Sequence, residues 1–198
     1  MAKKKDAALF KVALDLAAQK GWGRTTLSDI AEAAGMPLAE LYRQFRSKRA
    51  LLVAFSRRID EEVLANVDPD LASEPARDRL FSVLMQRFDA LGPYKAGLCA
   101  VVRDESCDPS ALLCGAPHLT RSMAWMLEAA GIGSAGFGGA LRVKGLAAIY
   151  LIALGVWFRD KSEDMSRTMA TLDRSLRRVD ALLATLKRRG PAPAPAAP

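Results

Sequence analysis

The sequence predicts an all-α protein. Apolar residues recur every three to four positions through most of the 198-residue chain, and no segment shows the alternation typical of a β-strand. Glycine and proline lie between these segments, where helices end and begin. With 51% hydrophobic residues, the chain can bury a sizeable core, and the apolar excess indicates a ligand cavity or a subunit interface.

The segment over residues 25–45 predicts two short helices joined by a tight turn. Thr26 followed by Asp29 has the form of a capping box and would start a helix over residues 27–34, which ends at Gly35. Pro37 would open a second helix over residues 38–45. Such a pair is typical of the helix-turn-helix that reads DNA, and a plain helical hairpin is the alternative.

The remaining elements are predicted to be helical as well. Ser47 would cap a long helix over residues 48–64 that joins two domains. Later helices are expected over residues 74–91, 94–103, 117–130, 140–158 and 162–188, with a further start at Pro109. Residues 131–136 match the pattern G-x-G-x-x-G, but a helix precedes them, so we interpret them as a connector and not as a nucleotide site.

Positive charge is concentrated at the N-terminal end. Residues 1–58 contain twelve Lys and Arg against five Asp and Glu, a net charge of +7 that equals the net charge of the whole chain. Residues 59–198 are therefore neutral overall. A basic head on a neutral body is typical of a domain that binds a polyanion, and we expect double-stranded DNA, with an anionic membrane surface as the alternative.

Residues 8–56 resemble the N-terminal domain of the TetR family of transcriptional regulators. The resemblance rests on a helix over residues 9–18 followed by Thr25-Thr26, Asp29-Ile30-Ala31, Ala34-Gly35, Leu41-Tyr42-x-x-Phe45 and Ser47-Lys48. It implies a three-helix DNA-binding domain over residues 1–50 and a helical domain for ligand binding and dimerisation over residues 51–189. The Pro- and Ala-rich tail over residues 190–198 is predicted to be disordered.

The expected DNA contacts lie on and around the second helix of the pair. The resemblance places Tyr42 at a position that contacts bases or phosphates and Lys48 at one that contacts phosphate. The predicted set is Thr26, Leu38, Ala39, Glu40, Tyr42, Arg43, Gln44, Lys48 and Arg49. Leu38 could touch a thymine methyl group, whereas Glu40 would repel phosphates unless it accepts from cytosine N4.

Two further sites are expected in the C-terminal part. A hydrophobic small molecule or lipid is predicted to bind Leu84, Met85, Phe88, His118, Arg121, Met123, Trp125, Met126, Tyr150 and Trp157, with an ordinary filled core as the alternative. An a/d seam over the last helix, together with the apolar helix over residues 140–158, predicts a homodimer interface of two helices from each subunit, unless the seam packs on its own domain. The seam residues are Met165, Met169, Leu172, Leu176, Val179, Leu183 and Leu186.

These observations favour a ligand-responsive transcriptional repressor that binds palindromic operator DNA as a homodimer. A second resemblance supplies the alternative: Trp157-Phe158-x-Asp160-x-Ser162-x-Asp164 is similar to a ubiquinone-biosynthesis accessory family that retains the TetR fold and binds lipid. That family does not regulate genes through its helix-turn-helix.

Several other classes of protein are disfavoured. His118 is the sole histidine, and the sequence around it supports no Ser–His–acid or Cys–His catalytic arrangement. We therefore expect that the protein is not an enzyme. Cys99, Cys107 and Cys114 match no metal spacing, and neither metal nor cofactor is predicted. The longest apolar run, residues 145–158, is shorter than the ~20 residues that span a bilayer. We therefore expect a cytoplasmic protein without a transmembrane segment or secretory signal.

Overall fold

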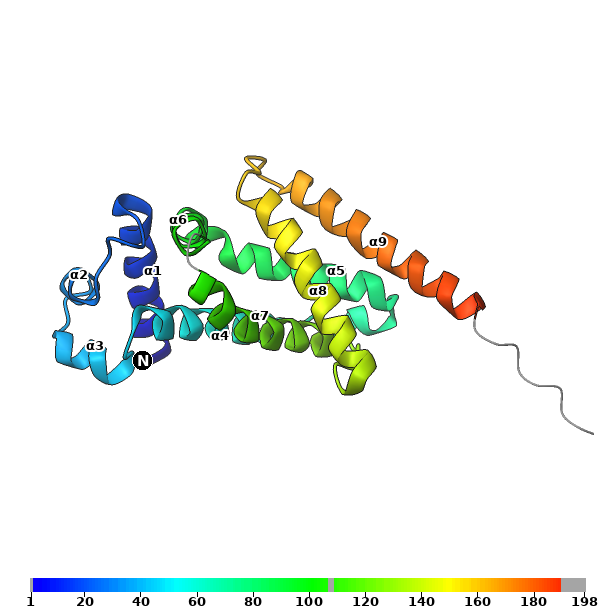
Figure 1. The fold of residues 1–198 in the computed structure, drawn as a ribbon, viewed down its shortest axis with the longest axis horizontal. Coiled ribbons are helices and arrows are strands. Elements are labelled where there is room, and N and C mark those ends of the chain that lie inside the picture. Colours follow the sequence, from blue (N-terminus) through cyan, green and yellow to red (C-terminus); the bar gives the residue numbers. More distant parts are fainter. Residues whose placement is uncertain (1, 107–108, 190–198) are drawn as a thin grey trace, which may run out of the picture.

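The computed structural model describes the backbone of residues 2–106 and 109–189 and the side chains of residues 6–106 and 115–181. Within these ranges all regular structure is helical and no strand occurs, so the protein has an all-α fold (Figure 1). Residues 190–198, for which the sequence predicts disorder, lie outside the described residues.

The first three helices form a compact unit at one end of the molecule. They are α1 (Ala2–Lys20), α2 (Leu27–Ala33) and α3 (Leu38–Gln44). The capping box at the start of α2 is present: the Thr26 side chain accepts from the Asp29 N–H at 3.1 Å, and the Thr26 N–H donates to the Asp29 carboxylate at 2.7 Å. Gly35 has a φ of 63°, which lets the chain turn sharply between α2 and α3.

The long helix α4 (Lys48–Ala65) leads from this unit into the rest of the protein (Figure 1). The Ser47 side chain accepts from the Ala50 N–H at 3.0 Å and so caps its start, as the sequence predicts. The following elements are η1 (Pro69–Ser73), α5 (Ala76–Leu91), η2 (Gly92–Tyr94), α6 (Lys95–Glu105), α7 (Pro109–Ala129), α8 (Gly136–Trp157) and α9 (Ser166–Arg189).

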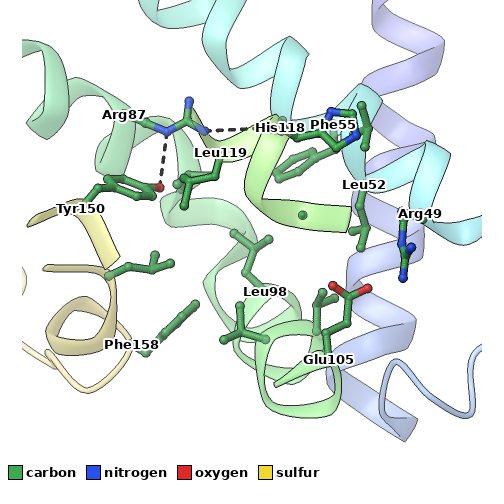
Figure 2. Close-up of a pocket in the computed structure, with 17 residues that line it drawn as sticks. Arg49, Leu52, Phe55, Arg87, Leu98, Glu105, His118, Leu119, Tyr150 and Phe158 are labelled. Atoms are coloured by element: carbon green, nitrogen blue, oxygen red, sulfur yellow. Dashed lines mark hydrogen bonds between the residues drawn. The ribbon is translucent and has the colours of Figure 1, made fainter. Parts of the chain in front are cut away.

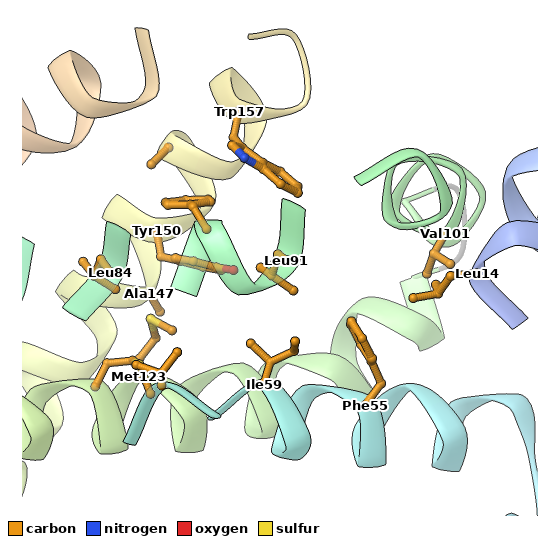
Figure 3. Packing of buried hydrophobic residues seen from close by; sticks show 14 of the residues in the cluster. Leu14, Phe55, Ile59, Leu84, Leu91, Val101, Met123, Ala147, Tyr150 and Trp157 are labelled. Atoms are coloured by element: carbon orange, nitrogen blue, oxygen red, sulfur yellow. The ribbon is translucent and has the colours of Figure 1, made fainter. Parts of the chain in front are cut away.

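The main core lies where α4, α5, α7 and α8 meet (Figure 3). Phe88 is fully buried there between the rings of Tyr150 and Trp157, with centroid distances of 5.4 and 5.7 Å. α9 covers this core from outside, packing on α8 and α5. Burial of these large side chains is the main force that holds the helices together.

The helix α6 ties the N-terminal unit to the body of the protein. It packs along α1 so closely that a Cβ atom on Gly97 would lie 2.3 Å from the carbonyl oxygen of Leu14. Only glycine fits at that contact. The rings of Phe10 and Phe55, 5.7 Å apart, join α1 to α4 beside it. The three-helix unit is therefore held by packing as well as by the covalent connection to α4.

Three helix boundaries differ from those predicted. α7 is one helix from residue 109, with Pro117 inside it, because a proline removes one intrahelical hydrogen bond without necessarily ending a helix. α8 begins at Gly136, earlier than predicted. α9 begins at Ser166, later than predicted, because the preceding residues form a cap around Asp160.

By length and composition alone, the helix α8 is long and apolar enough to cross a membrane. It begins well before the apolar run over residues 145–158 noted in the sequence. About 39% of its most apolar window is buried inside the fold, where Tyr150 and Trp157 belong to the core. Core helices of soluble proteins have the same properties, so the helix alone does not indicate a membrane span.

Candidate DNA-binding surface and ligand cavity

The helix α3 presents most of the predicted DNA-contacting side chains to solvent. Leu41 is fully buried and anchors the helix, while Tyr42 is 60% exposed and Leu38 is 50% exposed. Ala39, Arg43 and Gln44 are exposed as well, and Glu40 is half-buried. Thr26 is exposed at the start of α2. The structure thus gathers these side chains around one outward-facing helix, which is the geometry needed to enter a DNA groove.

Lys48 has a different environment from the one predicted. Its Nζ donates to the carbonyl oxygen of Trp22 at 2.6 Å and lies 4.8 Å from the centroid of the Trp22 ring. Burial lowers the pKa of Lys48, although Glu105, Asp104 and Asp29 act in the opposite direction. The ammonium group is therefore already bound within the protein, where it fastens the start of α4 to the turn between α1 and α2.

Arg49 also departs from the predicted phosphate site. It is half-buried and lines a cavity on the other side of α4. Consecutive helix residues point about 100° apart, so Arg49 faces a different direction from Lys48. Exposed cations nearby are Arg24, Arg43, Arg46 and Arg57. These side chains are better placed than Arg49 to attract a polyanion.

A cavity of about 240 Å³ lies where α4, α5, α6, α7 and α8 meet. Figure 2 shows Arg87 and Tyr150 beside each other on its wall, with apolar side chains such as Leu98 and Phe158 in the same cavity. The described lining is Arg49, Leu52, Val53, Phe55, Ser56, Arg87, Leu91, Leu98, Val101, Val102, Glu105, Gly115, His118, Leu119, Tyr150, Leu154 and Phe158.

Arg87 is the centre of a buried polar network. It forms an ion pair with Asp60, and Ser122 Oγ donates to the same carboxylate at 2.7 Å. Arg87 Nε donates to the Tyr150 hydroxyl at 3.3 Å, and a second guanidinium nitrogen lies 3.4 Å from Ser56 Oγ. Burial opposes the charge, but Tyr150 and Asp60 outweigh it and the pKa of Arg87 is raised. The guanidinium therefore stays charged inside the protein.

The cavity contains only part of the predicted ligand-binding set. His118 and Tyr150 line it, but Arg121 is exposed elsewhere and Trp125 is 53% exposed. The others belong to, or pack against, the filled core, namely Leu84, Met85, Phe88, Met123, Met126 and Trp157. Apolar spacing predicts which residues are buried, but it does not predict where the buried faces leave a space.

Several cavity residues were missed from the sequence. Arg87 could have been recognised from the sequence as a buried charge. It lies beside the apolar stripe of Leu84, Phe88 and Leu91, and a charged side chain buried there needs a partner. Ser56, Leu98 and Val101 carry no such signal. Their place at the cavity depends on how α4 and α6 pack.

The seam on α9 faces mainly inward. Leu172 and Leu176 are buried within their own subunit, so they are not available to a partner, and the prediction that they form a dimer interface is wrong for these two residues. Met165 and Met169 are half-buried, and Val179 is exposed. Leu183 and Leu186 lie outside the described side chains. The buried side chains of the seam pack against α8 and α5 of the same subunit.

The outer face of α8 carries exposed apolar side chains instead. Leu141, Leu151 and Ile152 are 66%, 53% and 58% exposed, respectively. Gly145, Ala148 and Gly155 are exposed on the same helix. Large exposed apolar side chains beside small residues are typical of a surface that another helix covers.

The motif that resembles the lipid-binding accessory family has a structural role here. Asp160 is buried, and its carboxylate accepts from Ser162 Oγ at 2.5 Å, from the Thr168 N–H at 2.9 Å and from Thr168 Oγ1 at 2.8 Å. The Lys95 ammonium donates to the Asp160 carbonyl oxygen at 2.5 Å. Asp160, Ser162 and Thr168 join the end of α8 to the start of α9 and do not line the cavity described above, whereas Phe158 of the same motif does.

Comparison with known proteins identifies the N-terminal unit. Residues 9–55 match the family model of the tetR family of bacterial regulatory proteins. The N-terminal unit is a TetR-family domain. A TetR transcriptional regulator from Nitrosomonas europaea ATCC 19718 superposes on it with a TM-score of 0.73 at 25% sequence identity, covering 89% of this chain and 98% of that one. The TetR-like fold extends through the whole body of the protein.

Two other TetR-family relatives show the same relationship at greater distance. A regulator from Rhodococcus sp. RHA1 shares the fold, with a TM-score of 0.62, 22% identity and coverage of 92% of this chain and 98% of that one. The uncharacterised helix-turn-helix regulator YerO of Bacillus subtilis (strain 168) is 29% identical over 90 residues, which are 44% of this chain. The match spans only 31% of the length of that relative. These relatives favour a regulator over the lipid-binding accessory family.

Proposed function

We propose that this TetR-family regulator is a ligand-responsive transcriptional repressor that binds palindromic operator DNA as a homodimer in the cytoplasm. The observation that carries the proposal is the exposed surface of α3, held by buried Leu41 within residues 1–58, which bear the whole net charge of the chain. Regulators of this family are generally not enzymes. Among the described side chains, no group of three or more His, Cys, Asp or Glu could hold a metal ion.

DNA recognition is assigned to α3 and its basic surroundings. Tyr42 and Gln44 are exposed on α3 and can reach base edges or phosphates in the major groove. Arg43 and Arg46 supply charge that attracts the backbone of any sequence. The ammonium of Lys48 supports this surface indirectly, because it fixes Trp22 and the turn that precedes α2.

Dimerisation is assigned to the outer face of α8 together with the exposed part of α9. Leu141, Leu151 and Ile152 would lose their solvent exposure against the same face of a second copy, as a two-fold axis requires. Val179 on α9 would extend that interface. Two α3 helices in one dimer can then reach half-sites about 34–36 Å apart on the same side of the DNA.

The ligand response is assigned to the cavity, because α6 connects it to the DNA-binding unit. Val101 and Glu105 line the cavity, and their neighbour Asp104 accepts a hydrogen bond of 2.9 Å from the Gly23 N–H. Gly97 on the same helix packs directly on Leu14 of α1. A ligand that favours one position of α6 would therefore shift the three-helix unit, provided that it binds that state more tightly.

The proposal is tested by selecting duplexes from a random-sequence library with the purified full-length protein. We expect an enriched palindromic motif whose half-sites are one helical turn apart, since each α3 reads one half-site. The variant Gln44→Ala should enrich a weaker or altered motif. Failure to enrich any motif at low salt would contradict the proposal.

A further inference from the structure

The polar groups of the cavity are mostly hydrogen-bond donors. The Tyr150 hydroxyl oxygen accepts from Arg87 Nε, and the Ser56 hydroxyl oxygen faces another Arg87 nitrogen. A hydroxyl that accepts from a guanidinium group keeps its own hydrogen to donate elsewhere. Arg87 has five N–H bonds, more than these partners and Asp60 occupy. This wall therefore presents donors to whatever occupies the cavity.

The ionisable side chains around the cavity are mostly basic residues. Arg49, Arg87 and His118 lie among the described residues that line it, and Glu105 is the one carboxylate among them. Asp60, the counter-ion of Arg87, lies behind the guanidinium and does not line the cavity. An acceptor group on a ligand could thus approach Arg87 without displacing the carboxylate that keeps this arginine stable inside the protein.

The rest of the cavity is apolar and small. Leu52, Leu98, Val101, Leu154 and Phe158 offer only hydrocarbon contacts. Cavities of about 150 Å³ with apolar walls hold a molecule of the size of benzene, and sites for drug-sized ligands have roughly 300–1,000 Å³. A volume of about 240 Å³ therefore suits a single ring or a chain of about eight carbons.

We propose that the cavity binds a small apolar carboxylic acid, with its carboxylate on the donors of Arg87, Tyr150 and Ser56 and its hydrocarbon part among the leucines of α4 and α6. A carboxylate accepts charge-assisted hydrogen bonds, which are stronger than those of a neutral acceptor in a low-dielectric site. The inference rests on the proposed function only in taking this cavity as the ligand site of the regulator.

Binding of three eight-carbon compounds to the purified full-length protein, measured by isothermal titration calorimetry without DNA, tests the proposal. Octanoate, octan-1-ol and octylamine share one hydrocarbon chain and differ in the charge of the head group. We expect octanoate to bind about tenfold or more tighter than octan-1-ol, since a bond to a charged group is the stronger one. Octylamine should bind weakest, because its ammonium would face a wall of donors.

Matched variants locate the carboxylate. Tyr150→Phe removes one hydroxyl at the cavity and should weaken octanoate about tenfold, whereas Tyr94→Phe removes a hydroxyl outside the described lining and should leave it unchanged. Ser56→Ala is a second, smaller deletion at the same wall, and circular dichroism confirms that each variant is folded.

Three results would overturn the inference: equal or tighter binding of octylamine, equal affinities of Tyr150→Phe and Tyr94→Phe for octanoate, or no binding of any of the three compounds. None of these results would contradict the proposed DNA binding, because no DNA is present in the measurement. Conversely, octanoate binding by a protein that selects no DNA motif would leave the carboxylate site intact and remove the regulatory function.

Discussion

The backbone N–H of Gly23 donates a hydrogen bond of 2.9 Å to Oδ2 of Asp104, across 81 positions of the sequence. The bond joins the turn between α1 and α2 to the end of α6, one residue away from the cavity residue Glu105. The Gly23 N–H is also the main reason that the pKa of Asp104 lies below its ordinary value. This hydrogen bond joins α6, which lines the cavity, directly to the DNA-binding unit.

Asp104→Ala should release that turn without unfolding the protein. Amide hydrogen exchange over residues 21–25 should become faster, because the Gly23 N–H loses its acceptor. Cys99→Ser, a change at an exposed position of the same helix, is the control and should leave exchange unchanged. Equal protection in both variants would show that the bond does not restrain the turn.

Lys48→Met should destabilise the protein by about 1 kcal/mol, because the ammonium loses its bond to the Trp22 carbonyl while the aliphatic stem stays packed. Arg46→Met removes the same charge from an exposed position and should leave the melting temperature nearly unchanged. DNA affinity should fall in both variants, since each loses a positive charge. If Lys48→Met melts like the wild type, Lys48 is free for phosphate and its structural role is refuted.

Ile152→Glu should convert the proposed dimer to monomers that remain folded, because the charge would be buried in the interface but is exposed in a single subunit. Leu176→Glu should instead lower the melting temperature at every protein concentration, since Leu176 lies in the subunit core. Analytical ultracentrifugation and thermal unfolding separate the two outcomes. A stable dimer of the Ile152→Glu variant would exclude this face of α8.

Asp160→Asn should destabilise the protein most at neutral pH. Bonds from Ser162, followed by those from Thr168, hold the pKa of Asp160 far below its ordinary value. A depressed pKa contributes stability that is complete above the unfolded value of about 3.9 and declines as the pH falls toward the folded value. The difference in melting temperature between wild type and variant should therefore shrink as the pH falls from about 5 to 3.

Asp173→Asn is the control for that pH series. Asp173 pairs with Arg177 on the exposed side of α9, with a shortest separation of 2.9 Å, and exposed pairs contribute little to stability. Its effect on the melting temperature should be small at every pH. A constant difference for Asp160→Asn across the range would mean that its carboxylate is not what holds α8 and α9 together.

Local sequence signals predicted the helices and the N-terminal unit well. The helix caps at Thr26 and Ser47 and the break at Gly35 act within a few residues, so the sequence contains all of their determinants. The TetR resemblance over residues 8–56 agrees with the family match over residues 9–55. The TetR resemblance placed Tyr42 among the DNA contacts, and its side chain is exposed on α3.

Long-range packing accounts for the predictions that failed. The seam that contains Leu172 and Leu176 is compatible with either a partner or the subunit core, and the positions of α8 and α5 decide between them. The cavity depends on how five helices meet, so Trp157 and Met123 were assigned to a space that the core fills. The Lys48 side chain points inward because its ammonium group donates to the carbonyl oxygen of Trp22, 26 positions away.

The affinity of the purified protein for duplex DNA over a salt series tests the central claim most directly. Fluorescence anisotropy would compare the duplex upstream of the protein's own gene with a shuffled duplex, between about 50 and 200 mM salt. We predict a steep loss of affinity with salt for both duplexes and a preference for the upstream duplex that Gln44→Ala reduces. Absence of affinity for either duplex at the lowest salt concentration would contradict the account.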